Sequence, residues 1–255
     1  RNGAVSFTPM MDIFLRNGYA VFSWDKPGSG ESTGQINHAL TQRAEILADG
    51  IQLLSEHPNI DPSRIGLWGI SQAGWVMPLA LELRDDVAFM IVVSGGAEDS
   101  TQQGAYMVSQ QVLSDGGTEE QAALVERYWP QKFSAEAYDQ YREAMEVLMG
   151  IPQVQSRYNL EIMEEKQWKP LSRDLDLFID PMEVIEHTTI PVLAFFGELD
   201  KIIDPLQGAQ AYEAAMQKAG NQDYQVIFIP GVAHVFVYSP RYLEALEAWI
   251  QHLVP

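Results

Sequence analysis

The sequence predicts an α/β fold in which helices cover both faces of a mostly parallel sheet. Short, continuously apolar runs alternate along the chain with stretches of helical periodicity, and strands buried on both faces have this continuous apolar character. With 255 residues, of which 46% are hydrophobic, the chain is long enough to bury one sizeable core. The predicted strands are residues 19–24, 64–68, 89–94, 190–196 and 224–229.

Helix start and stop signals flank these strands. Thr8-Pro9-Met10 predicts a helix that Thr8 caps and that Asn17-Gly18 ends, because proline is favoured in the first turn and glycine just past the last. Pro58 ends a second helix over 41–56, because the residue before a proline disfavours helical geometry. Further core helices are expected from Trp75 onward, over 206–219 and over 240–253.

The stretch from residue 97 to residue 186 interrupts this alternation with helix signals alone. Thr118 and Gln121 form a capping box that predicts a helix over 119–129. Ser134 is expected to cap another helix that runs to Met149, and a third is expected over 152–167. We therefore predict a core of residues 1–96 and 187–255 and a helical cap, or lid, of residues 97–186. Its large apolar side chains should mostly pack the cap, and the rest should line an acyl or alcohol pocket: Tyr106, Met107, Tyr128, Trp129, Phe133, Met145, Met149, Tyr158, Met163 and Trp168.

Gly69-Ile70-Ser71-Gln72-Ala73-Gly74 is the most informative motif. It lies between a predicted strand and a predicted helix, so Ser71 falls on a tight strand-to-helix turn. A serine there is exposed above the sheet as a nucleophile, and its strained backbone requires small neighbours. An ordinary connecting loop would also fit the short motif, but the strand before it and the helix after it favour a catalytic serine.

Two later strands end in residues that complete a catalytic triad. Asp200 lies just beyond the strand 190–196, and His234 lies beyond the strand 224–229. Functional groups of open α/β sheets gather at the carboxyl ends of strands. A serine nucleophile needs a base and a carboxylate that orients the base, here in the chain order serine, acid, histidine.

Other acids and histidines are weaker candidates. Asp204 precedes Pro205, which suits it to capping a helix, and Glu198 is a third candidate for the acid. The remaining histidines do not follow a strand beyond the acid and are expected at the surface: His38, His57, His187 and His252.

These motifs resemble those of serine hydrolases of the α/β-hydrolase superfamily. The elbow over 67–75, the Gly-Glu-Leu-Asp loop over 197–200 and the Pro-Gly-Val-Ala-His loop over 230–234 are similar to those of bacterial esterases. They also resemble the catalytic domains of prolyl-oligopeptidase-type peptidases and acyl-thioester hydrolases. The glycine-rich turn over 24–32 adds to the resemblance, and we expect it to be structural, because no G-K-[ST] sequence follows to make a phosphate cradle.

The resemblance implies an α/β-hydrolase fold and cleavage of carboxylic esters through an acyl-enzyme on Ser71. The backbone N–H of Gln72 would supply one oxyanion donor. The second donor and the first strands of the sheet are expected upstream of Arg1, because Arg1-Asn2-Gly3 resembles the tail of the donor loop. Peptide or thioester cleavage by the same triad, and a non-catalytic binding module on this scaffold, remain as alternatives.

The amino-acid composition limits the classes of partner and cofactor that the chain is expected to bind. The absence of cysteine excludes a thiol nucleophile and cysteine-ligated metals, and the proposed chemistry needs no cofactor or metal. A formal net charge of −19 disfavours nucleic acids and anionic membranes as partners. The resemblance implies a small-molecule ester as the partner. No apolar run has the length of a membrane span, and no secretory signal opens the chain, which only slightly favours the cytoplasm. The oligomeric state is left open.

Overall fold

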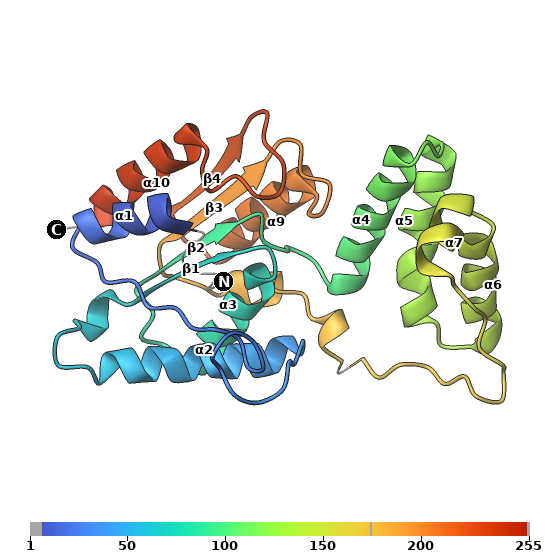
Figure 1. Ribbon diagram of the computed structural model, residues 1–255, viewed down its shortest axis with the longest axis horizontal. Helices are drawn as coiled ribbons and strands as arrows, with labels where there is room; N and C mark the ends of the chain where they lie inside the picture. The colour runs from blue at the N-terminus through green and yellow to red at the C-terminus, as the bar shows by residue number, and fades with distance from the viewer. Residues whose placement is uncertain (1–6, 174, 254–255) are drawn as a thin grey trace.

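A computed structural model describes residues 7–173 and 175–253, and it places four strands in one parallel sheet (Figure 1). In spatial order these are β1 (Gly66–Ile70), β2 (Phe89–Val93), β3 (Val192–Gly197) and β4 (Tyr224–Ile229). Because all four run in parallel, their carboxyl ends meet at one edge of the sheet. The segments that follow β1, β3 and β4 carry Ser71, Asp200 and His234.

Two sets of helices cover the two faces of the sheet. One face packs against α2 (Leu40–Ser55), α3 (Ala73–Leu83), α8 (Met182–Ile185) and α9 (Pro205–Lys218). The other packs against α1 (Thr8–Arg16) and α10 (Pro240–Leu253). Successive residues of a strand point to opposite faces, so the continuous apolar run of β2 fills both cores, with all five of its residues buried. The prediction of an α/β fold is confirmed.

Residues 19–24, predicted as a strand, form none. The ring of Tyr19 packs edge-on against Phe14 and Phe89, while Phe22 and Trp24 remain 45% and 42% exposed. Side-chain packing therefore holds the segment beside the core without a ladder of backbone hydrogen bonds. Within the described residues, β1 pairs with β2 alone, so the apolar character of 19–24 is not sufficient for a strand.

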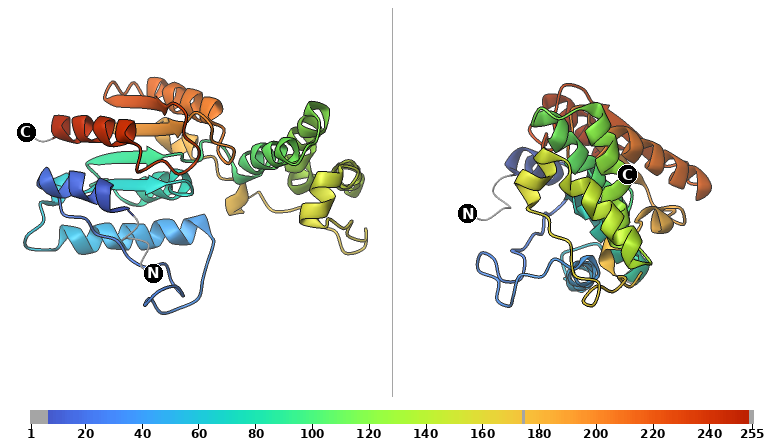
Figure 2. Two further views of the ribbon diagram at one scale, coloured as in Figure 1. Left: turned by 45° about the horizontal axis from the view of Figure 1, so that its top comes forward. Right: turned by 90° about the vertical axis from the view of Figure 1, so that its right-hand side faces the viewer.

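The helical insertion contains α4 (Ser100–Ser114), α5 (Glu119–Ser134), α6 (Tyr138–Met149) and α7 (Pro152–Tyr158). These helices lie apart from the sheet, on the side toward which the carboxyl ends of its strands point (Figures 1 and 2). The chain then returns through an irregular segment, the 3₁₀ turn η3 (Asp176–Phe178) and α8. The insertion has apolar clusters of its own, and α4 is its helix nearest the sheet in Figure 1.

Several predicted helix ends were wrong, each for a local reason. The Thr118–Gln121 capping box is present, but α5 continues past residue 129 through Pro130 to Ser134, which therefore caps nothing. The following helix begins after Ala137, where the side chain of Gln140 accepts from the Ala137 N–H. Asn159, with φ of 44°, ends α7 well before residue 167.

Two smaller differences concern the ends of the core. Phe7, not Thr8, occupies the N-cap position of α1, while Gly18 at φ of 83° follows its end as predicted. The 3₁₀ turn η2 (Pro62–Arg64) precedes β1, so the strand begins at Gly66, two residues later than predicted, and ends at Ile70, directly before Ser71. Among the described residues, no helix combines the length and the apolar character needed to cross a membrane.

Candidate active site

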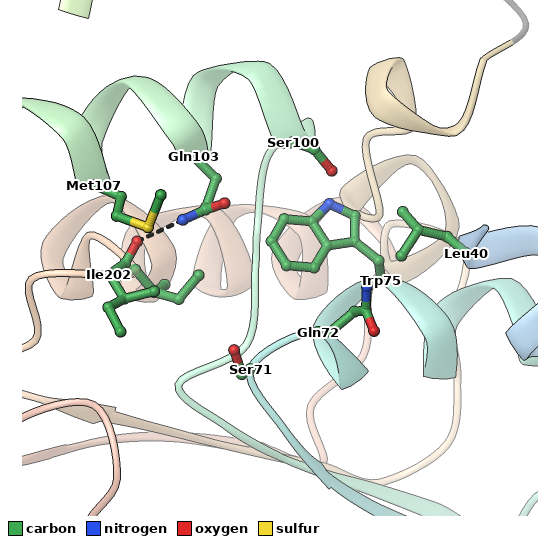
Figure 3. A pocket seen from close by; sticks show the side chains of 9 residues that line it. Leu40, Ser71, Gln72, Trp75, Ser100, Gln103, Met107 and Ile202 are labelled. Carbon is green, nitrogen blue, oxygen red and sulfur yellow. Dashed lines mark hydrogen bonds between the residues drawn. The ribbon is translucent and has the colours of Figure 1, made fainter. Parts of the chain in front are cut away.

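The turn between β1 and α3 holds Ser71 in a left-handed backbone conformation, with φ of 59° (Figure 3). Its N–H donates to the carbonyl of Val93 at the end of β2, at 2.9 Å. A Cβ atom on Gly69 would lie 2.3 Å from Cβ of Ala73, so both positions must be small. The sequence between strand and helix therefore produces a strained, rigid turn that holds Ser71 at the carboxyl edge of the sheet.

Gly74 has a separate reason to be glycine. A Cβ atom there would lie 2.4 Å from the backbone nitrogen of Gly96, in the chain that leaves β2. The first turn of α3 thus rests directly on the backbone of Gly95 and Gly96. The elbow tolerates alanine at position 73 because the closest backbone approach falls one residue later.

Asp200 and His234 lie in contact beyond the ends of β3 and β4. The distance from Oδ2 of Asp200 to Nδ1 of His234 is 2.8 Å, and the two side chains are 1% and 13% exposed. The other carboxylate oxygen of Asp200 accepts from the backbone N–H groups of Ile202 and Ile203, at 2.8 and 3.1 Å. Because a carboxylate only accepts, Nδ1 of His234 carries the hydrogen and Nε2 is left as a base.

The other two acids have structural roles in the same region. Asp204 accepts from the N–H groups of Leu206 and Gln207 and so caps α9, as the sequence predicts. Glu198 accepts from the Gly231 N–H at 2.8 Å, which ties the acid loop to the histidine loop. No other histidine of the described residues hydrogen-bonds to Asp200.

Within the described part of the chain, the side chain of Ser71 and the backbone N–H of Gln72 are both unpaired at this turn. The hydroxyl of Ser71 and the backbone N–H of Gln72 make no hydrogen bond to another described residue. Gln72 is at the N-cap of α3, where the helix dipole favours negative charge. The second donor was expected upstream of Arg1, and the tail of its loop, Arg1-Asn2-Gly3, lies outside the described residues.

A pocket of about 200 Å³ opens beside Ser71 (Figure 3). The first turns of α2 and α3, the segments that follow β1 and β3, and α4 line it together: Leu40, Ser71, Gln72, Trp75, Ser100, Gln103, Met107, Ile202 and Ile203. A second hollow of about 490 Å³ shares Leu40, Gln72 and Ser100 with the pocket, and its other lining residues are His38, Ala39, Thr41, Leu175, Asp176 and Leu177. The two hollows therefore adjoin.

Of the large apolar side chains singled out between residues 97 and 186, Met107 alone lines the pocket. Most of the others pack inside the insertion: Tyr128, Trp129, Phe133, Met145, Tyr158 and Trp168. Sequence analysis missed α4 and with it Ser100 and Gln103. The signal was present, since Asp99 accepts from the N–H groups of Thr101 and Gln102 as an N-cap.

The chain that enters the insertion carries an unusual carboxyl group. Burial, together with the smaller effects of the negative charges of Asp204, Asp99 and Asp180, raises the pKa of Glu98 to about 7. The backbone carbonyl of Glu98 accepts from the indole of Trp75 at 2.8 Å. The start of the insertion is thus held against the elbow helix. Within the described part of the chain, no three acidic or histidine side chains are grouped so as to hold a metal ion.

This fold and this arrangement are those of a hydrolase of the α/β-hydrolase superfamily. The chain belongs to the family described as X-Pro dipeptidyl-peptidase (S15 family), whose profile matches residues 2–235. It is similar in fold to an esterase from Pyrococcus furiosus, with a TM-score of 0.62 at 12% identity over 100% of this chain and 78% of the other. It is likewise similar to the structure of DcsB in complex with its substrate analogue, with a TM-score of 0.57 at 20% identity over 99% and 86%.

A local sequence match gives a different kind of comparison. The chain is 35% identical over 65 residues to thiohydrolase aneE of Aspergillus aculeatus, a segment that covers 25% of this chain and 20% of that protein. The match thus spans a fifth of the relative's length.

Proposed function

We propose that this hydrolase cleaves carboxylic esters through an acyl-enzyme intermediate, with Ser71 as nucleophile, His234 as base and Asp200 as the orienting acid. The observation that carries the proposal is the buried Asp200–His234 pair at the same sheet edge as the strained Ser71 turn. Separate strands position each of these residues, as a preorganised triad requires.

The chemistry then follows from the hydrogen-bonding groups. Nε2 of His234 takes the hydroxyl proton as Oγ of Ser71 attacks the carbonyl carbon. The oxyanion forms against the Gln72 N–H, and His234 returns the proton to the leaving alcohol as the bond to it breaks. Water then attacks the acyl-enzyme by the same route and releases the acid. Asp200 fixes the ring tautomer and stabilises the imidazolium.

Thioester or peptide cleavage is the second candidate, because the triad serves all three reactions. The resemblance to a thiohydrolase over 65 residues favours thioesters, and the peptidase named in the family description favours peptides. A non-catalytic module is a weaker alternative, since it has no need of a buried Asp–His pair.

The first experiment is labelling with a fluorophosphonate probe, followed by mass mapping of the modified residue. We expect modification at Ser71 and none in Ser71→Ala. A wild-type protein that does not react is a binding module. A panel of p-nitrophenyl esters, acyl thioesters and aminoacyl amides then ranks the three reactions by kcat/KM. Esters should lead, and a higher kcat/KM for thioesters or amides would replace the ester assignment.

A further inference from the structure

The two hollows lie to one side of the proposed triad. Both are lined by Gln72, whose N–H is the proposed oxyanion donor, and the smaller is also lined by Ser71. His234 lines neither of them. These two hollows therefore lie away from the side chain of the proposed base.

The direction of proton transfer indicates which part of the substrate binds in the two hollows. His234 must protonate the leaving group, so the leaving group lies on the histidine side of the tetrahedral carbon. The oxyanion lies against the Gln72 N–H, and the acyl substituent takes the remaining direction. Resting on the proposed function, we infer that the two adjoining hollows bind the acyl part of the substrate, whereas the leaving group stays outside both.

The lining residues indicate the chemistry of that acyl group. The wall of the smaller hollow is mainly apolar: Trp75, Met107 and Ile202 line this hollow only, and Leu40 lies where it adjoins the larger one (Figure 3). Each CH₂ group buried there is worth about 0.8 kcal/mol, or roughly fourfold in kcat/KM when the contact persists in the transition state. The portion of the acyl group that adjoins the reacting carbonyl is therefore a hydrocarbon.

Polar groups follow where the two hollows meet. Gln72 and Ser100 line both hollows, and neither the side-chain amide of Gln72 nor the hydroxyl of Ser100 makes a hydrogen bond to another described residue. Such groups lose affinity if a purely apolar chain covers them and gain it if they are paired. The favoured acyl group thus carries a hydroxyl or carbonyl several atoms from the ester.

Large apolar side chains on the histidine side are exposed. Leu199, Val235 and Tyr238, in the acid and histidine loops, are 56%, 63% and 55% exposed. A leaving group there meets an open surface and not a fitted wall. Such an enzyme selects its acyl group and tolerates leaving groups of different bulk.

Two ester series test this directly. The first keeps p-nitrophenol and varies the acyl group from acetyl to hexanoyl and 6-hydroxyhexanoyl. The second keeps hexanoyl and varies the bulk of phenols matched in acidity. We expect kcat/KM to rise at least tenfold from acetyl to hexanoyl, to rise again for 6-hydroxyhexanoyl, and to change less than threefold across the phenols. Stronger dependence on phenol bulk than on the acyl group would overturn the inference while leaving ester hydrolysis intact. Failure to cleave any ester would instead reject the proposed function.

Matched variants locate the selectivity. Met107→Trp fills the pocket and should lower the hexanoyl-to-acetyl ratio at least fivefold, whereas Met163→Trp, at a cap position 46% exposed, should not. Ser100→Ala removes one hydroxyl from the first turn of α4 and should reduce the preference for 6-hydroxyhexanoyl over hexanoyl. The exposed Ser156 gives the control Ser156→Ala. Ratios that match the wild type in both Met107→Trp and Ser100→Ala would show that these hollows do not hold the acyl group.

Discussion

The phenolic hydroxyl of Tyr106, on α4, donates a hydrogen bond to the main-chain oxygen of Asp200 at 2.8 Å. Two neighbouring contacts reinforce it. Nε2 of Gln103 donates to the carbonyl of Ile202 at 2.7 Å, and Nζ of Lys201 donates to Oγ of Ser114 at 3.1 Å. The first helix of the insertion, α4, therefore braces the loop that holds the proposed triad acid. The same helix forms part of the pocket wall, so hydrogen bonds join this wall to the loop of Asp200.

Tyr106→Phe tests whether this brace positions the acid. Removing the hydroxyl leaves the Asp200 carbonyl unpaired, at a cost of about 1 kcal/mol. If part of that cost appears as displacement of the carboxylate, kcat should fall about threefold to tenfold with little change in KM. Steady-state kinetics and the rate of fluorophosphonate labelling measure the effect.

Tyr128→Phe is the matched control. Its hydroxyl bonds to Glu143 within the insertion, so its loss should lower the melting temperature without lowering kcat. Equal kinetic effects of the two substitutions would mean that Tyr106 acts only on stability.

Ser71 offers a paired test of function and strain. Both Ser71→Ala and Ser71→Gly should lose on the order of 10⁴-fold in kcat, because each lacks the nucleophile. Since φ is 59°, glycine should relieve strain that alanine retains, which makes Ser71→Gly more stable by about 1 kcal/mol. That corresponds to about 2–4 °C in thermal unfolding. Residual turnover near the wild-type rate in either variant would exclude Ser71 as the nucleophile.

Gly74→Ala should disrupt the elbow itself. The added Cβ atom would meet the backbone nitrogen of Gly96 at 2.4 Å, and backbone cannot rotate away as a side chain can. We expect a loss of about 2–4 kcal/mol of stability together with most of the activity. The control is Gly50→Ala in α2, where the nearest atom is a Trp24 ring carbon at 3.5 Å. It should be neutral or stabilising by up to about 1 kcal/mol, as alanine favours helix. Chemical denaturation and ester turnover compare the pair.

How far the sequence predicts this molecule depends on how local each signal is. The strands that precede Ser71, Asp200 and His234 are short apolar runs bounded by turn residues, so their existence and order could be predicted from the sequence. The Asp204 cap and the Thr118 capping box were equally local.

What could not be predicted depends on contacts between distant segments. Residues 19–24 have the composition of a strand, but a strand also needs a hydrogen-bonding partner along its edge. The pocket next to Ser71 depends on where α4 docks, which is set by contacts such as Gln103 with Ile202, far apart in the sequence. Ser134 has the residue type of a cap, yet continuation of α5 through Pro130 leaves it inside a helix.

Glu98 provides a test of electrostatics where the insertion leaves the core. Burial and the charges of Asp204, Asp99 and Asp180 raise its pKa from the ordinary value of 4.5 to about 7. Between those pH values the folded state binds the proton more tightly than the unfolded state does, so stability falls as pH rises through this window and stays lower above it.

Glu98→Gln removes the ionisation and should abolish that part of the decline. Because the group is partly solvated, we expect a gain on the order of 1 kcal/mol, or about 2–4 °C in melting temperature, at pH 8 and little gain at pH 5. Glu45→Gln, at an exposed position of α2, controls for the loss of one negative charge from an acidic protein. Melting curves of the wild type and the two variants at both pH values measure this gain. An equal gain in melting temperature at pH 5 and pH 8, or the same gain in the Glu45 variant, would show that the surroundings of Glu98 do not oppose its ionisation.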